Sequence, residues 1–166
     1  MSGPLTGVRI VDLSTMLMAP YATQMLADMG ADVIKVEPPE GDPTRGWGPP
    51  WVGSGAARTA AYYLSVNRGK RSIVLDLAGS DDDRAELRRL AAGADVLIET
   101  GAPGELAALG LGYDDLAAVN PALVHCSITP FGQDGPKRSW KATDLTVWAA
   151  AGPMALCGDA DRAPLQ

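Results

Sequence analysis

The side chains best suited to chemistry are few and scattered along the chain. The single histidine, His125, lies beside Cys126 in an apolar run typical of a buried strand, so we interpret both as core residues. Asp144 follows a Gly/Pro-containing loop and precedes an apolar stretch. There a carboxylate either caps a helix, which we favour, or serves a site as an acid or base. Ser14 and Thr15 follow the first apolar run, where we favour helix capping over ligand contact.

Several common motifs of catalysis and cofactor binding are missing from the sequence. The turn after the first apolar run reads STMLMAP and lacks the GxGxxG of dinucleotide-binding folds. Neither a P-loop nor a GxSxG nucleophile elbow occurs. With one histidine, two cysteines and neither CxxC nor HExxH, the sequence lacks the usual ligands of zinc, so we expect no metal.

Short apolar runs alternate with helical patterns along the sequence, as in α/β domains. Strands are predicted at 8–13, 32–37, 72–77, 95–99 and 122–128. Helices are predicted at 20–29, 103–109, 113–119 and 144–151, and another begins after Ser80 with Arg84, Arg88 and Arg89 facing solvent. This alternation predicts a Rossmann-like, doubly wound parallel sheet with helices on both faces.

Residues 38–60 form a long loop in this prediction. The segment holds ten glycines and prolines together with Trp47 and Trp51, so it cannot be a regular helix or a central strand. Loops of this length inside an α/β domain are often functional. The segment is either a surface excursion whose tryptophans pack locally or a cover over a ligand or partner subunit.

The composition is typical of one globular domain, with at most a small second one. The chain has 166 residues, of which 46% are hydrophobic and 20% charged. Its net charge of −6 is a poor electrostatic match for nucleic acid or an anionic membrane surface. No apolar run approaches the ~20 residues of a membrane span, and no signal peptide is visible. With only two cysteines, we expect a cytoplasmic protein.

Five stretches of the sequence are specific enough to be compared with known protein families. They begin with PLTGVRIVDL at 4–13 and LADMGADVIKVEPP at 26–39, and continue through 41–50, NRGKRSI at 67–73 and SITPFGQDGP at 127–136. In this order and nearly in register, they resemble the class III (CaiB/BaiF-type) CoA-transferase family over essentially the whole chain. The resemblance implies that residues 1–166 form the N-terminal portion of the family's Rossmann-like large domain, without its small domain.

The resemblance also implies an activity, the transfer of CoA from an acyl-CoA to a carboxylic acid. An aspartate carboxylate attacks the thioester to give a mixed anhydride and then an aspartyl-CoA thioester, from which the acceptor takes CoA. By this resemblance the aspartate falls just beyond Gln166, so the chain alone is expected to lack it. The implied partners are acyl-CoA, the carboxylic acid, and either a second copy or a CoA-transferase homologue. The alternatives are a non-catalytic subunit that pairs with a full-length homologue, or a racemase- or dehydratase-type member.

Individual positions follow from the same resemblance. The positions implied to contact CoA are Arg45, Leu75, Thr100, Gly101 and Lys141, and those implied to line the active site are Leu17, Thr143 and Asp144.

The sequence also departs from the family pattern. Thr100 and Gly101 replace an Asn-Phe pair that flanks CoA, and Ala78 and Ala108 stand where basic residues often contact phosphate. Both changes are expected to weaken CoA binding. Thr143 stands where the racemases have a catalytic histidine, which disfavours racemisation.

Overall fold

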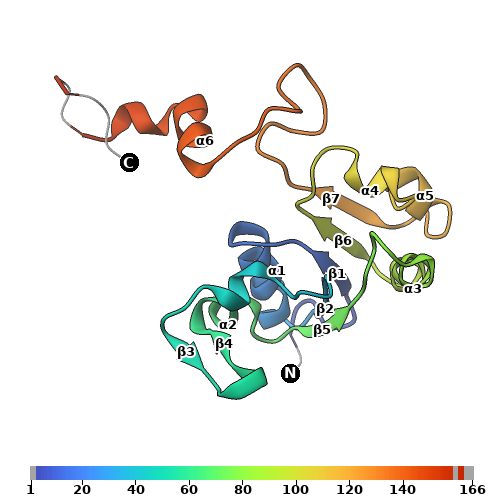
Figure 1. The fold of residues 1–166 in the computed structure, drawn as a ribbon. Coiled ribbons are helices and arrows are strands. Elements are labelled where there is room, and N and C mark those ends of the chain that lie inside the picture. The colour runs from blue at the N-terminus through green and yellow to red at the C-terminus, as the bar shows by residue number, and fades with distance from the viewer. Residues whose placement is uncertain (1–2, 159–160, 163–166) are drawn as a thin grey trace. The chain divides into compact units, whose positions relative to one another are not determined.

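A five-stranded parallel sheet organises the first part of the chain (Figure 1). The computed structural model describes residues 3–158 and 161–162, which divide into two units at Ile128 and Thr129. The sheet has the order β5-β2-β1-β6-β7. Its strands are β1 (Arg9–Leu13), β2 (Asp32–Glu37), β5 (Arg71–Val74), β6 (Val96–Glu99) and β7 (Val124–Ser127). Every neighbouring pair is parallel, and the order reverses between β1 and β6, as in Rossmann folds.

Helices cover both faces of this sheet, as the sequence predicted. They are α1 (Met18–Asp28), α2 (Ala61–Asn67), α3 (Asp81–Ala92), α4 (Glu105–Ala108) and α5 (Tyr113–Ala117). Successive residues of β1 enter two different cores, because side chains alternate across a strand. Ile10 packs with Ala19 of α1, whereas Val11 packs with Leu87 of α3 and Leu116 of α5.

Helix ends follow the sequence signals in part. The Ser80 hydroxyl accepts a hydrogen bond from the Asp83 backbone N–H at 3.1 Å, so Ser80 caps α3 as predicted. Gly30 follows α1 with a φ of 102°, which suits a glycine beyond a helix end. The prediction that Ser14 or Thr15 caps α1 is wrong, because Leu17 occupies the N-cap without a side-chain hydrogen bond.

One predicted strand boundary is corrected, and one helix was not predicted. The third strand ends at Val74 instead of residue 77, because the backbone N–H of Asp76 turns to the Asp83 carboxylate at 2.8 Å. Helix α2 was missed, since Tyr62, Tyr63 and Val66 are aromatic or β-branched residues that favour strands.

Segment 38–60 is neither a helix nor a central strand, as predicted, but it is ordered. It contains two 3₁₀ turns and a two-stranded antiparallel ladder: η1 (Pro43–Gly46), β3 (Trp51–Val52), η2 (Gly55–Ala57) and β4 (Thr59–Ala60). Its tryptophans pack locally. The Trp47 ring lies 5.5 Å from that of Tyr62, and the Arg58 guanidinium lies 4.0 Å from the Trp51 ring centre.

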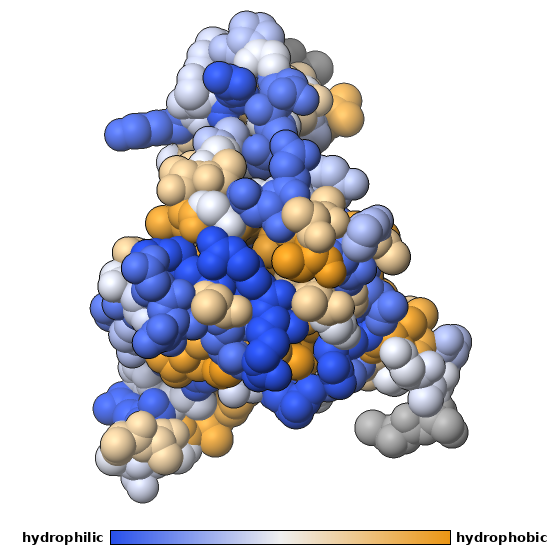
Figure 2. Space-filling view, turned by 90° about the vertical axis from the view of Figure 1, so that its right-hand side faces the viewer, coloured by the Kyte–Doolittle hydropathy of each residue, from blue (hydrophilic) through white to orange (hydrophobic). Residues whose placement is uncertain are grey.

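The three arginines of α3 differ in their exposure to solvent, although all three were predicted to face it. Hydrophilic residues do cover much of the molecular face on which α3 lies (Figure 2). However, Arg84 donates to the carbonyl of Leu77 at 2.7 Å, and Arg88 donates to that of Gly110 at 3.0 Å. Only Arg89, which pairs with a glutamate one turn earlier, matches the expected exposed position.

Residues from Thr129 onward form the second unit. It contains α6 (Asp144–Ala151) and the 3₁₀ turn η3 (Pro153–Leu156). Thr143 is the N-cap of α6, exchanging hydrogen bonds with Thr146, so the preference for Asp144 as the cap is wrong. Asp144 is the first helical residue, where its charge suits the helix dipole. Within the described part of the chain, no helix is long and apolar enough to cross a membrane.

The cap of α3 gives a direct test of the fold. Replacing Ser80 by alanine is expected to lower the free energy of unfolding by about 1 kcal/mol, because the Asp83 N–H loses its acceptor. Ser80→Asp should retain the stability. The matched control is Ser54→Ala, because Ser54 precedes η2 without a side-chain cap. Urea unfolding followed by circular dichroism measures both, and equal losses at the two positions would contradict the assignment.

Candidate functional site

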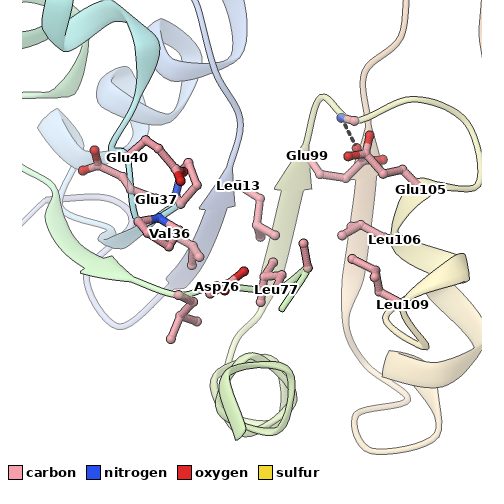
Figure 3. Close-up of a pocket in the computed structure, with 15 residues that line it drawn as sticks. Leu13, Val36, Glu37, Glu40, Asp76, Leu77, Glu99, Glu105, Leu106 and Leu109 are labelled. Carbon is pink, nitrogen blue, oxygen red and sulfur yellow. Dashed lines mark hydrogen bonds between the residues drawn. The ribbon is translucent and has the colours of Figure 1, made fainter. Parts of the chain in front are cut away.

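A pocket of about 390 Å³ opens at the carboxyl edge of the sheet (Figure 3). It lies at the ends of β1, β2 and β6 and at the segment that follows β5, which includes the point where the strand order reverses. Open α/β sheets bind ligands at this edge, because the loops that follow the strands leave a crevice there. The pocket is therefore the leading candidate for a ligand site.

One wall of the pocket is apolar. Its side chains come from three strand ends and from α4 and the turn after it: Leu13, Val36, Leu75, Leu77, Leu106 and Leu109. Leu75 is 4% exposed, and its backbone N–H donates to the carbonyl of Glu37 at 2.9 Å, which holds it against the end of β2. A wall of this kind favours a flat apolar group such as a purine ring.

The charged side chains that line the pocket are all acidic. They are Glu37, Glu40, Asp76, Glu99 and Glu105, and no lysine, arginine or histidine lines it among the described residues. The pocket therefore carries negative charge at neutral pH.

Gly101 lies between two of these carboxylates. The Glu99 carboxylate accepts from the Gly101 N–H at 2.5 Å (Figure 3), and that of Glu105 accepts from the Ala102 N–H at 2.8 Å. A side chain at position 101 would begin 3.0 Å from Glu105 Oε2 and 3.2 Å from Glu99 Oε2. Glycine therefore keeps this part of the pocket lining open.

Glu37 is held so tightly that it cannot offer its oxygens to a ligand. Arg45 donates to both of its oxygens at 2.6 and 2.7 Å, and the Tyr63 and Ser72 hydroxyls donate at 2.9 and 2.5 Å. The backbone of Asp42 adds a fifth donor at 2.9 Å. Burial alone would raise the pKa of Glu37, but these hydrogen bonds outweigh it and lower the pKa to about 2.

Arg45 faces Glu37 and does not line the pocket. Its guanidinium also donates to the Tyr63 hydroxyl at 2.7 Å and lies 3.8 Å from the centre of that ring. Burial and the neighbouring Glu37 charge raise the pKa of Tyr63, so the hydroxyl stays protonated. The arginine implied to contact CoA thus has internal partners in this structure.

Two buried lysines support the same edge of the sheet. Lys70 pairs with Asp12 at 2.9 Å, with side-chain exposures of 2% and 0%, and also donates to the carbonyl of Pro20 at 2.8 Å. Lys35 pairs with Asp42 at 2.9 Å and donates to the carbonyl of Ser14 at 2.7 Å. Burial lowers the pKa of Lys70, against the charge of Asp12, which raises it.

The turn between β1 and α1 is built around Asp12. The hydroxyl of Ser14 donates to the Asp12 carboxylate and is fully buried, so Ser14 is a structural residue here. Met16 has a φ of 72°, a left-handed conformation that non-glycine residues rarely adopt and that often marks functional turns. Leu17, which follows it, is 47% exposed.

The structure brings together only some of the implied site residues. Leu75, Gly101 and the substituted position Ala78 line the pocket, and Ala108 does not. Thr100 lies next to the pocket, where its hydroxyl accepts from the backbone N–H of Thr15 at 3.1 Å. The remaining implied residues, Lys141, Thr143 and Asp144, belong to the second unit.

The interpretation of His125 and Cys126 as core residues needs correction. Both lie on β7, which is an edge strand, so Cys126 is exposed and His125 is only half-buried. Both ring nitrogens of His125 are shielded from solvent without a hydrogen-bond partner in the described structure. Burial lowers the pKa of His125, although the charge of Glu99 opposes the shift.

Comparison with known proteins decides the family. The family model described as CoA-transferase family III matches residues 5–166. The chain belongs to CoA-transferase family III. It is 50% identical over 166 residues to the succinate–glutarate CoA-transferase of Agrobacterium fabrum, covering 98% of this chain and 41% of that protein. It is 43% identical over 164 residues to the human succinyl-CoA:glutarate CoA-transferase, covering 98% and 36%.

A solved structure of the family supports the fold. A CAIB/BAIF family protein from Brucella suis aligns with a TM-score of 0.94 and 46% identity, over 100% of this chain and 44% of that one. The chain therefore spans about two fifths of the length of the family proteins it matches. Among the residues that the structure describes, no cluster of three or more potential ligands could hold a metal ion.

The buried ion pair of Lys70 can be tested against an exposed ion pair. Lys70→Met is expected to lower the free energy of unfolding by about 3 kcal/mol or more, because it leaves Asp12 buried without its countercharge. The control is Arg68→Met, whose pair with Asp28 is exposed and should be worth no more than about 1 kcal/mol. Urea unfolding at neutral pH measures both variants, and similar losses would show that Lys70 has no special role.

The low pKa of Glu37 predicts that the folded protein loses stability in acid. Its folded pKa of about 2 lies below the ordinary value of 4.5, so its stabilisation is complete above pH 4.5 and is lost as the pH falls toward 2. About 2 kcal/mol of this stabilisation should be gone at pH 3. In Glu37→Gln this loss should disappear, whereas Glu40→Gln, on the exposed side of the pocket, should keep it. Urea unfolding midpoints at pH 3 and pH 7 measure the loss of stability in each protein. If Glu37→Gln loses as much stability at pH 3 as the unchanged protein, Glu37 is not its source.

Proposed function

We propose that residues 1–166 form the CoA-binding N-terminal portion of an acyl-CoA:carboxylate CoA-transferase, with an acyl-CoA and a carboxylic acid as its substrates. The observation that carries this proposal is the pocket at the carboxyl edge of the parallel sheet, lined by Leu75 and Gly101. The relatives named above, which are CoA-transferases, support the same reaction type. The portion proposed is that of the large domain, without the small domain.

In this proposal the pocket receives the adenosine end of CoA. The apolar wall around Leu75 offers a surface for the purine, while Gly101 and Thr100 border the space that the rest of the molecule enters. Arg45 acts by fixing the wall through Glu37, and Lys141 of the second unit is a candidate for contact with CoA phosphates.

The covalent chemistry needs a carboxylate nucleophile, which we place after Gln166. That aspartate attacks the thioester carbonyl and expels the CoA thiolate, giving a mixed anhydride. The thiolate then attacks the aspartyl carbonyl, which releases the acyl group as a carboxylate and leaves an aspartyl-CoA thioester. The acceptor carboxylate repeats the exchange in reverse order and leaves with CoA. Leu17, Thr143 and Asp144 are the candidates to line this reaction site.

The acyl groups to test first are dicarboxylic. Two similar relatives are named for succinate or succinyl-CoA and for glutarate, which are short dicarboxylates. We therefore propose a dicarboxylyl-CoA as donor and a dicarboxylate as acceptor.

A second candidate is a CoA-transferase-like subunit that acts with a homologue or a second copy. One side of α1 favours it, because its large apolar residues remain exposed: Met18, Tyr21, Met25 and, just after the helix, Met29. Exposed apolar rows of this kind often mark protein–protein contacts.

CoA binding is the first test. The chain is expected to bind CoA in isothermal titration calorimetry, and Gly101→Leu should weaken binding at least tenfold by filling the pocket. The matched control is Gly46→Leu, because a side chain at position 46 meets open space outside the pocket. Equal effects of the two variants, or no CoA binding, would refute the site.

Transfer is tested on the native protein isolated from its source. Incubation with succinyl-CoA and glutarate is expected to yield glutaryl-CoA, detected by chromatography. CoA binding without transfer to any short dicarboxylate would instead favour the non-catalytic subunit.

A further inference from the structure

The charge of the pocket bears on which part of CoA it can hold. All five charged side chains that line it are carboxylates, and one of them, Glu99, is 6% exposed. A phosphate monoester carries between one and two negative charges at neutral pH. Placed among these carboxylates, it would meet charge of its own sign in surroundings that water screens only partly.

The arginines next to the pocket are engaged by protein acceptors, and Arg45 offsets the charge of Glu37 alone, which leaves four lining carboxylates without a paired arginine among the described residues. Arg45 is bound to Glu37 and Tyr63, as described above. Arg84 donates to the carbonyls of Leu77 and Ala78, which belong to the pocket wall, at 2.7 and 3.2 Å, and its guanidinium also pairs with an aspartate of α3. Both guanidinium groups thus have protein acceptors, and at position 78, where the family often has a basic residue, Ala78 contributes only a methyl group to the lining.

A neutral nucleoside fits the same surroundings well. The apolar wall suits a purine ring, while the exocyclic amine of adenine and the ribose hydroxyls are hydrogen-bond donors that carboxylates can accept. Glu37 is saturated by five donors, so the acceptors that remain on the lining are Glu40, Asp76, Glu99 and Glu105.

We propose that this pocket binds the adenosine moiety of CoA and excludes its 3′-phosphate, so that the chain binds 3′-dephospho-CoA at least as tightly as CoA. The inference rests on the proposed function and adds which groups of CoA the chain recognises. The ribose enters with its 3′-oxygen directed out of the pocket, and the carboxylate lining takes the donors of the base and sugar.

The test compares three ligands at one ionic strength by isothermal titration calorimetry: CoA, 3′-dephospho-CoA and adenosine. The expected dissociation constant for 3′-dephospho-CoA is equal to or below that for CoA, within about threefold, and adenosine competes with both. CoA binding at least tenfold tighter than 3′-dephospho-CoA would overturn the inference while leaving the proposed function intact. Failure of all three ligands to bind would overturn both.

A charge reversal sharpens the test. Glu40→Lys places a cation on the exposed part of the lining and is expected to shift the affinity ratio at least fivefold toward CoA. The matched control is Asp114→Lys, the same change of charge on α5 outside the pocket lining, which should leave the ratio unchanged. An unchanged ratio in Glu40→Lys, or the same shift in both variants, would show that the lining charge does not select the ligand.

Discussion

The ion pairs between Lys70 and Asp12 and between Lys35 and Asp42 hold together the edge of the sheet on which the pocket opens. All four side chains are at most 2% exposed, so each charge depends on its partner and on the carbonyl groups that accept from the lysines. Through these contacts the end of β1, the first turn of α1, the end of α2 and the segment after β2 are joined at one place. This cluster therefore fixes the turn after β1 and the segment after β2, of which residues 38–40 line the pocket.

The Glu37–Arg45 contact extends that cluster into the pocket wall. It ties β2 to η1, while Tyr63 and Ser72 bring in α2 and β5. The Gly/Pro-rich segment therefore has two parts. Residues 38–40 line the pocket, whereas its tryptophans pack against nearby side chains. The local packing of the tryptophans confirms the first alternative considered for this segment, whereas its role as a cover over a ligand or partner subunit stays a prediction.

Local patterns in the sequence predicted the sheet and the α3 cap, because alternation and capping depend on neighbouring residues. They could not reveal the buried role of Lys35, which lies in a short strand and meets its partner only after the chain turns back. The acidic residues of the pocket were missed for a similar reason. Glu40 and Asp76 lie in turns, where carboxylates are usually solvated, and only the folded chain brings them to one cavity. The family resemblance pointed to Leu75 and Gly101, which line it, and also to Arg45, which does not.

The depth of the two lysine–aspartate pairs has a consequence for experiments at high ionic strength. Dissolved ions screen exposed charges, such as those of Arg68 and Asp28, over a Debye length of about 10 Å at 0.1 M salt, but they hardly affect pairs enclosed by protein. The scaffold around the pocket should therefore keep its geometry in concentrated salt. Any change in ligand affinity along a salt titration then reports on the charge interaction between the ligand and the pocket lining, because the protein framework stays constant.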